Sequence, residues 1–282
     1  MKSPDIIEKI SGSLIQHGPL NNRLYLIKAN KNISTPFVEN LIQKAIENNY
    51  TKIFAKIPES SLKPFLNLRF NIEAQIPFFY SGKESAFFLG LYLKKSRAKE
   101  IYLEKRKDIL LKAEAKKKLS KKKIKETNLN FIFRKCNLKD VKEMASLYKK
   151  IFISYPFPIY QPQYLEQTMK THVDYFGAEL EGKLVALSSA EKDKENKNVE
   201  MTDFATLPEW RGYGLAQNLL LKMENYIRQE KILTAYTIAR AYSLGMNLVF
   251  ANNDYIYRGC LINNTNISGQ IESMNVWSKN LK

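Results

Sequence analysis

A cation, two glycines and a small residue stand directly before a long amphipathic stretch in LPEWRGYGLAQNLLLKMENYI, residues 207–227. Glycine disfavours helices but permits close backbone approach, so this point in the chain requires bare backbone. The first turn of a helix presents unpaired N–H groups at the positive end of the helix dipole, which together bind anions. Gly212 and Gly214 admit a phosphate, Ala216 is small, and Arg211 adds positive charge. The pattern predicts a phosphate-binding turn.

Two familiar phosphate loops are excluded by their spacing. The Lys-Ser/Thr pair of a Walker loop does not follow the glycines, and the spacing is not that of a dinucleotide fingerprint. Residues 198–207 are predicted to form a strand before the turn. After it, apolar residues at helical spacing predict a helix that packs on a sheet. The spacing and its context therefore indicate a strand, an anion-binding turn and a helix.

The elements that must position this unit alternate between strands and helices from residue 131 onward. We expect a strand at 131–137, an amphipathic helix at 138–152, and a hairpin at 174–193 that turns at Glu181-Gly182. After the phosphate turn and its helix we expect further strands and one short helix, at 232–240, 242–253 (the helix), 254–264 and 273–279.

The first 93 residues indicate a separate, smaller α/β unit. Strands are predicted at 23–29 and 51–58, and two more around the turn residues Ser81 and Gly82. A helix is predicted at 34–50, because Ser and Thr precede Pro36 and apolar residues follow at helical spacing.

The net charge of +17 is concentrated in one part of the chain. Residues 1–130 hold 26 Lys and Arg against 12 Asp and Glu, whereas residues 131–282 hold 19 against 16. Residues 94–125 alone carry 15 basic and 4 acidic side chains, without Gly or Pro, so we predict a basic helical linker at 94–130. A solvated helix is the main interpretation. Contact with nucleic-acid phosphates is the alternative, but Tyr102 is the one aromatic residue available there for base stacking.

Composition excludes several other classes of protein. No apolar run approaches the roughly 20 residues of a membrane helix, and the charged N-terminus does not resemble a signal peptide. Cys136 and Cys260 lie far apart in unrelated contexts, which favours free thiols in a reducing compartment. We expect a cytoplasmic protein with no membrane partner and no metal.

The stretch from Arg211 to Ala216 matches the Arg/Gln-x-x-Gly-x-Gly/Ala signature of the GNAT acetyltransferases, and its strand and helix context supports the match. The runs EMTDFATLPEWRGYGL, TAYTIARAYSLGMN and LINNTNISG resemble the β-lysine N-acetyltransferases of that superfamily, as does NIEAQIPFFYSG in the first unit. The resemblance implies an α/β fold with a mixed sheet: a GNAT domain at 131–282 and a smaller N-terminal α/β domain at 1–93. A degenerate GNAT-like half is one interpretation of the smaller domain. The others are a wall of the substrate pocket and a surface for dimer contacts.

The same resemblance implies acetyl-CoA as co-substrate and β-lysine as acceptor, acetylated at its terminal N6 amine to the compatible solute N6-acetyl-β-lysine. In GNAT proteins the pantetheine arm lies between two splayed parallel strands, which correspond here to EMTDFATL and TAYTIAR. The cofactor-binding residues carried over by the resemblance are Phe204, Ala205, Thr206, Leu207, Arg211, Gly212, Tyr213, Gly214, Leu215, Ala216 and Asn247.

An amine with a pKa near 10.4 must lose a proton before it attacks a thioester, so a carboxylate base is expected. Glu200 and Asp203, on the strand before the turn, are the candidates; Asp203 could instead hold the substrate ammonium. An ideal strand points positions three apart to opposite faces, unless a bulge intervenes. Where many GNAT members carry an acid tyrosine, this chain has Phe250, with Tyr242 or Tyr255 as substitutes.

Asn263, Asn264 and Asn266 are expected to bind the zwitterionic substrate, although turn capping is the commoner use of Asn. Two alternative functions stay open. One is acetylation of another primary amine, such as a protein lysine or a small polyamine. The other is a nucleic-acid-associated regulator that only senses acetyl-CoA, although we do not expect nucleic acid as a partner. A homodimer is also left open.

Overall fold

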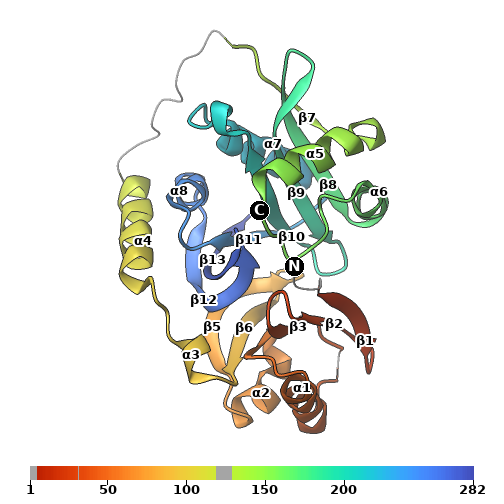
Figure 1. Cartoon of the computed structure of the whole chain (residues 1–282), viewed down its shortest axis with the longest axis vertical. Helices are drawn as coiled ribbons and strands as arrows, with labels where there is room; N and C mark the ends of the chain where they lie inside the picture. Colours follow the sequence, from red (N-terminus) through yellow and green to blue (C-terminus); the bar gives the residue numbers. More distant parts are fainter. Residues whose placement is uncertain (1–4, 31, 119–128) are drawn as a thin grey trace.

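The computed structural model describes residues 5–30, 32–118 and 129–282. Thirteen strands of these residues form one continuous mixed sheet, in the order β1-β2-β3-β4-β6-β5-β12-β13-β11-β10-β9-β8-β7. Figure 1 shows the N-terminal half below and the C-terminal half above, with the last strands of the chain between them.

The N-terminal half combines a meander, a crossover helix and a hairpin. Helix α1 begins where Ser34 caps it by accepting a bond from the Phe37 N–H, and Pro36 occupies its first turn. Its apolar face buries Val38, Leu41 and Ala45 against the sheet. The elements are β1 (Ile6–Ile10), β2 (Ser13–Gly18), β3 (Arg23–Lys28), α1 (Thr35–Glu47), β4 (Lys52–Pro58), α2 (Leu62–Asn67), β5 (Asn71–Tyr80) and β6 (Glu84–Tyr92).

The C-terminal half also combines antiparallel strands, a crossover helix and a hairpin, and it has more helices. Helix α7 lies against the sheet through Leu219, Leu220 and Met223, all fully buried, as its spacing predicts. The elements are β7 (Ile132–Lys135), α5 (Val141–Ile151), α6 (Pro162–Thr171), β8 (Val173–Leu180), β9 (Lys183–Asp193), β10 (Asn198–Thr206), α7 (Leu215–Gln229), β11 (Thr234–Arg240), α8 (Leu244–Asn252), β12 (Ile256–Ile267) and β13 (Gln270–Asn280).

The two halves repeat one connection pattern. In the first, an antiparallel meander ends at β3, α1 crosses over to the parallel strand β4, and the hairpin β5–β6 adds β6 beside β4. In the second, β10, α7, β11 and the hairpin β12–β13 follow the same course. The hairpins of the two halves meet where β5 pairs with β12. This repetition is consistent with the interpretation of the first half as GNAT-like.

The junction between the halves depends on a glycine and a shared core. Gly259 lies opposite Ala74 with φ +144°, and a Cβ there would stand 2.2 Å from the Glu73 carbonyl oxygen. A buried apolar cluster then spans both halves, drawing Tyr25, Phe54, Ile76 and Phe88 from the first and Tyr236, Leu261, Met274 and Val276 from the second. The halves are therefore packed as one body.

The basic segment forms α3 (Lys95–Ala98) and α4 (Leu103–Lys118), and α4 lies beside α8 (Figure 1). Ile109 and Ala113 on α4 are buried, so this helix is docked on one side and not solvated all round. The remaining part of the predicted linker, residues 119–128, lies outside the described residues. The hairpin β1–β2 and the helix α6 were not predicted from the sequence.

Candidate active site

The parallel strands β10 and β11 separate at the centre of the second half. Their pairing covers Asn198–Thr234 to Glu200–Tyr236 and then ends, although β10 runs on to Thr206 and β11 to Arg240. Beyond the last pair the backbone edges of the two strands are no longer paired with each other. An extended chain with amide groups can therefore lie between them and hydrogen bond like an added strand.

The predicted phosphate turn stands at the end of this opening. Gly214, with φ +72°, is the N-cap of α7, and Gly212 has φ +90°, so both adopt the left-handed backbone that favours glycine. Apart from its chain neighbours, no heavy atom of the described residues lies within 4 Å of a Cβ built on Gly212, so these residues leave the turn open in front. Arg211 is exposed and its Nε donates to the Thr206 carbonyl at 3.3 Å, which keeps its charge beside the turn.

On the other side of the opening lies a cavity that both halves of the chain enclose. The second half contributes β9 to β12, and the segment between α5 and α6 covers it with Phe152, Tyr155 and Phe157. The first half closes one end with β3 and β4 side chains, namely Arg23, Tyr25, Ile27, Phe54 and Lys56. The lining is mostly apolar, with charged groups at a few places, as is usual for a small-molecule site.

Asp203 reaches this cavity because β10 bulges. The register between β9 and β10 shifts between Thr202 and Ala205, and Asp203 has φ +55°. Both Asp203 oxygens accept hydrogen bonds, from the Ser189 hydroxyl at 2.5 Å and from the Tyr155 hydroxyl. Burial outweighs these bonds and raises the pKa of Asp203 to about 6. The bulge thus places Asp203 and Glu200, three positions apart, in one cavity.

Glu200 lies deeper along the same strand, beside a second carboxylate. Burial, and then repulsion from Glu191 on the neighbouring strand β9, raise the pKa of Glu200 to about 7. The charge of Lys56 and the Tyr236 hydroxyl act in the opposite direction and lower the pKa of Glu200, and Lys56 Nζ donates to that hydroxyl at 2.9 Å. A carboxyl group with a pKa near neutrality is suited to general-base catalysis.

The tyrosines expected to assist the leaving thiolate lie elsewhere. Phe250 lines the cavity and is fully buried. Its ring stands edge-on to that of Phe204, with the ring centres 5.6 Å apart. Among the described residues the cavity lining includes neither Tyr242 nor Tyr255. The Tyr242 hydroxyl donates to Glu100 at 3.0 Å. Burial and the nearby charge of Glu224 raise the pKa of Tyr255 well above its usual value.

The predicted asparagines are distributed over different contacts. Asn264 lines the cavity, whereas the Asn263 amide donates to the carbonyls of Arg97 and Lys99. The side chain of Asn266 bonds to Ser154 and to the Leu20 carbonyl. The Asn247 amide is fully buried and bonds to residues 240, 243, 275 and 277, so it ties α8 to β11 and β13.

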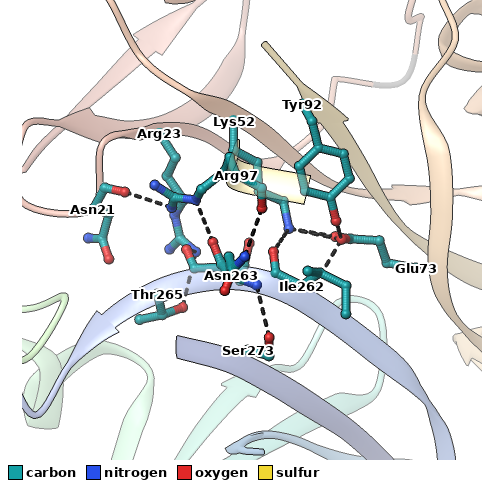
Figure 2. A network of polar contacts seen from close by, with 11 residues as sticks. Asn21, Arg23, Lys52, Glu73, Tyr92, Arg97, Ile262, Asn263, Thr265 and Ser273 are labelled. Atoms are coloured by element: carbon teal, nitrogen blue, oxygen red, sulfur yellow. Dashed lines mark hydrogen bonds and ion pairs between the residues drawn. The ribbon is translucent and has the colours of Figure 1, made fainter. Parts of the chain in front are cut away.

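A buried polar network holds the part of β12 that borders the cavity (Figure 2). The pairing of β12 with β13 is interrupted between Leu261 and Thr265, which leaves backbone groups of β12 in need of partners. The first half supplies partners from three cationic side chains and one acid: Lys52 to the Ile262 carbonyl (2.8 Å), Arg97 to the Asn263 carbonyl (2.6 Å), Arg23 to the Asn264 carbonyl (2.6 Å) and Glu73 to the Ile262 N–H (3.0 Å).

The ion pair at the centre of this network is almost fully buried. Lys52 Nζ lies 2.8 Å from Glu73 Oε2, with both side chains at most 4% exposed. Burial lowers the pKa of Lys52 to about 8 despite the neighbouring Glu73 carboxylate. Figure 2 shows Tyr92 donating to the same carboxylate. The first half therefore fixes the irregular backbone on which Asn264 and Thr265 reach the cavity.

Several cavity residues were missed by sequence reasoning. Tyr155 lies in the aromatic and proline-rich run SYPFPIY, whose composition was the available signal for a binding loop. Lys56 stands in an ordinary strand pattern, and Glu191 in a charged hairpin end, so nothing in the sequence marked them. Within the described ranges, no three His, Cys, Asp or Glu side chains group as a metal site, and no helix is long and apolar enough to cross a membrane.

Comparison with known proteins shows which family the chain resembles. Residues 141–245 match the acetyltransferase (GNAT) family. The chain is 36% identical over 273 residues to a β-lysine N(6)-acetyltransferase of Methanococcus maripaludis, covering 97% of this chain and 98% of the relative. It is 30% identical over 269 residues to the N-acetyltransferase YodP of Bacillus subtilis, covering 95% and 96%. A β-lysine N(6)-acetyltransferase of Methanosarcina mazei is 39% identical over 142 residues, covering 50% and 52%.

Proposed function

The chain belongs to the GNAT acetyltransferases, within the family of the β-lysine N6-acetyltransferases, and from that membership we propose that it acetylates the N6 amine of β-lysine. The GNAT family implies acetyl-CoA as the co-substrate. The product is N6-acetyl-β-lysine, a compatible solute, and the released group is the thiol of coenzyme A. The observation that carries the assignment is similarity along the whole chain, both halves included.

The coenzyme side of the site is the opening between β10 and β11 with the turn before α7. The pantetheine arm lies against the backbone of residues 204–207, where β10 no longer pairs with β11. The pyrophosphate lies against the N–H groups of Gly212 to Ala216, near the exposed Arg211. Asp203 and Phe204 have no partner in the β9 register, so the Phe204 N–H is the donor for the thioester oxygen.

The acceptor amine reaches the thioester from the cavity. Asp203, beside the bulge, holds the substrate ammonium close to the thioester, because its buried charge attracts a cation. Glu200 takes one proton from that ammonium, directly or through one water. The neutral amine then attacks the thioester carbonyl, the carbon–sulfur bond breaks, and the thiolate leaves without a tyrosine acid, as Phe250 at the corresponding position suggests.

The form of the cavity supports a small acceptor over a protein lysine. A lysine in a folded protein must enter through an open groove, whereas this cavity is bounded by strands of both halves and by the segment between α5 and α6. The carboxylates Glu191, Glu200 and Asp203 suit a substrate with more than one amino group. Polyamines share that property, so they belong in the test.

The test is acetyl-CoA turnover with purified protein and β-lysine, α-lysine, spermidine or a lysine-containing peptide as acceptor. We expect the highest kcat/KM with β-lysine, and mass and NMR spectra that place the acetyl group on N6. A preference for spermidine or for the peptide would overturn β-lysine as substrate and leave the GNAT assignment standing. Weaker acetyl-CoA binding by Arg211→Ala, with unchanged thermal unfolding because this side chain is exposed, would support the coenzyme side.

A further inference from the structure

Lys56 brings a positive charge from the N-terminal half into a cavity whose C-terminal walls are acidic. It lies on β4, on the same face as Phe54, and both line the cavity. Lys56 is half-buried, and its Nζ lies over the rings of Tyr236 and Phe79, at 5.2 and 5.9 Å from their centres. Among the described residues it makes no ion pair with a carboxylate. A half-buried ammonium without an ion pair is a costly arrangement, which a bound anionic group would relieve.

The other cations of the cavity are already engaged by the protein. Arg240 makes a two-bond ion pair with Glu272, at 2.7 and 2.9 Å. Arg23 is 3% exposed and donates through Nη1 to the Asn264 carbonyl and the Thr265 hydroxyl, while its Nε has no hydrogen-bond partner among the described residues. Lys56 donates one bond to Tyr236, so two of its three N–H groups remain for a ligand.

The cavity places a positive side chain, Lys56, and the acidic side chains of β10 at different points. An amino acid with a carboxylate at one end and an amine at the other carries the complementary charges. Lys56 Nζ donates to the Tyr236 hydroxyl at 2.9 Å, and the charge of Lys56 lowers the pKa of Glu200, so Lys56 stands near that carboxylate. Asp203 stands further along β10, at the bulge beside the opening for the coenzyme. A ligand with its carboxylate at Lys56 and its terminal amine at Asp203 would extend along β10.

We propose that Lys56 binds the carboxylate of the acceptor and thereby selects amines that carry a carboxylate over amines that do not. The inference rests on the proposed function and deepens it. It also gives the N-terminal half a direct part in substrate choice, because β4 supplies the residue. Lys52 lies on the same strand as Lys56, and it bonds to Glu73 on β5 and to the Ile262 carbonyl on β12, so it holds β4 against β12 while Lys56 faces the ligand.

The experiment compares two acceptors that differ only in that charge: β-lysine and its C1 carboxamide. CoA thiol release gives kcat/KM for the wild type, Lys56→Met, Lys56→Arg and the control Lys63→Met, which alters an exposed lysine of α2. We expect Lys56→Met to lose about 10- to 100-fold with β-lysine, the range for one charged hydrogen bond, and to change less than about threefold with the carboxamide. Lys56→Arg should keep much of the preference, and Lys63→Met should leave both rates unchanged.

An equal loss with both acceptors would overturn the proposal, because Lys56 would then act through Tyr236 on Glu200. Unchanged rates in Lys56→Met would overturn it as well. Failure of the proposed function gives a different result: the wild type would acetylate neither acceptor. In that event calorimetric binding of the acid and the carboxamide to wild type and Lys56→Met, with coenzyme A present, decides the role of Lys56. Preference for the acid that Lys56→Met abolishes would support it, and equal binding would overturn it.

Discussion

Replacing Glu200 by Gln removes the carboxylate that we assign as the base and keeps the shape of the side chain. The wild-type kcat/KM should fall about tenfold per pH unit below a midpoint near 7, because the base must be ionised and burial raises its pKa to about 7. Glu200→Gln should lose this acid limb and should be slower by about 10²- to 10⁴-fold at pH 8, the usual contribution of a general base.

The same substitution should stabilise the fold at neutral and alkaline pH. The pKa of Glu200 is raised from 4.5 to about 7 on folding, so the ionised form is less favourable in the folded state. At about 1.4 kcal/mol per pKa unit, the ionised Glu200 lowers the free energy of unfolding by on the order of 3 kcal/mol above pH 7. This destabilisation declines to nothing below pH 4.5. Gln is also polar and buried, so we expect a gain of about 1–2 kcal/mol at pH 8 and none at pH 4.

Thermal and urea unfolding at pH 4 and pH 8 measure the stability, and CoA release between pH 5.5 and 9.5 measures the rate. Asp203→Asn is the matched control. Because the Asp203 carboxyl has a pKa near 6, its removal should keep the fall of kcat/KM below pH 7 and should raise the KM for the amine. If Glu200→Gln keeps kcat/KM within about threefold and keeps the limb, Glu200 is not the base. If Asp203→Asn instead abolishes the limb, the two roles are reversed.

Three further predictions concern the junction and the phosphate turn. Lys52→Met should destabilise the fold by about 3–5 kcal/mol in urea unfolding, because it leaves the Glu73 carboxylate buried without its partner. Adding Glu73→Leu should recover only part of this loss, since the Ile262 N–H and the Tyr92 hydroxyl then lose their acceptor. Equal stability of the single and double variants would contradict the role of the ion pair. Gly259→Ala should prevent the close pairing of β5 and β12 and lower the Tm by several degrees, and an unchanged Tm would show that the strands can shift at no cost. Gly212→Val should raise the KM for acetyl-CoA at least about tenfold without changing the KM for the amine, whereas a change in both would place the turn nearer the acceptor.

Much of the local structure could be predicted because its signals are short-range. Ser34 and Pro36 begin α1, and the left-handed glycines Gly212 and Gly214 mark the turn before α7, as expected. The hairpin β1–β2 was missed because β1 is largely exposed and β2 buries polar residues such as Gln16 and His17, so neither strand shows a clear apolar alternation. Helix α6 follows a proline-rich run that masks its start.

The site could be predicted only in part, since its residues come together from distant segments. Glu200 and Asp203 were candidates from the sequence, but a strand predicts opposite faces for them, and only the bulge in β10 brings both to the cavity. Lys56 and Tyr236 lie 180 positions apart and meet because β4 and β11 face one another across the junction of the halves. No local pattern encodes such a contact.

The sequence by itself determined the family, the glycine turn before α7 and the strand that carries the two acids, because these depend on residue type and spacing within a few turns of chain. The tertiary structure decided that the first half belongs to the site. In the folded chain β5 pairs with β12, and the backbone of the irregular strand β12 bonds to Arg23, Lys52, Glu73 and Arg97. Burial in the same fold raises the pKa values of Glu200 and Asp203. Burial and long-range pairing are properties of the folded chain, and no single segment contains them.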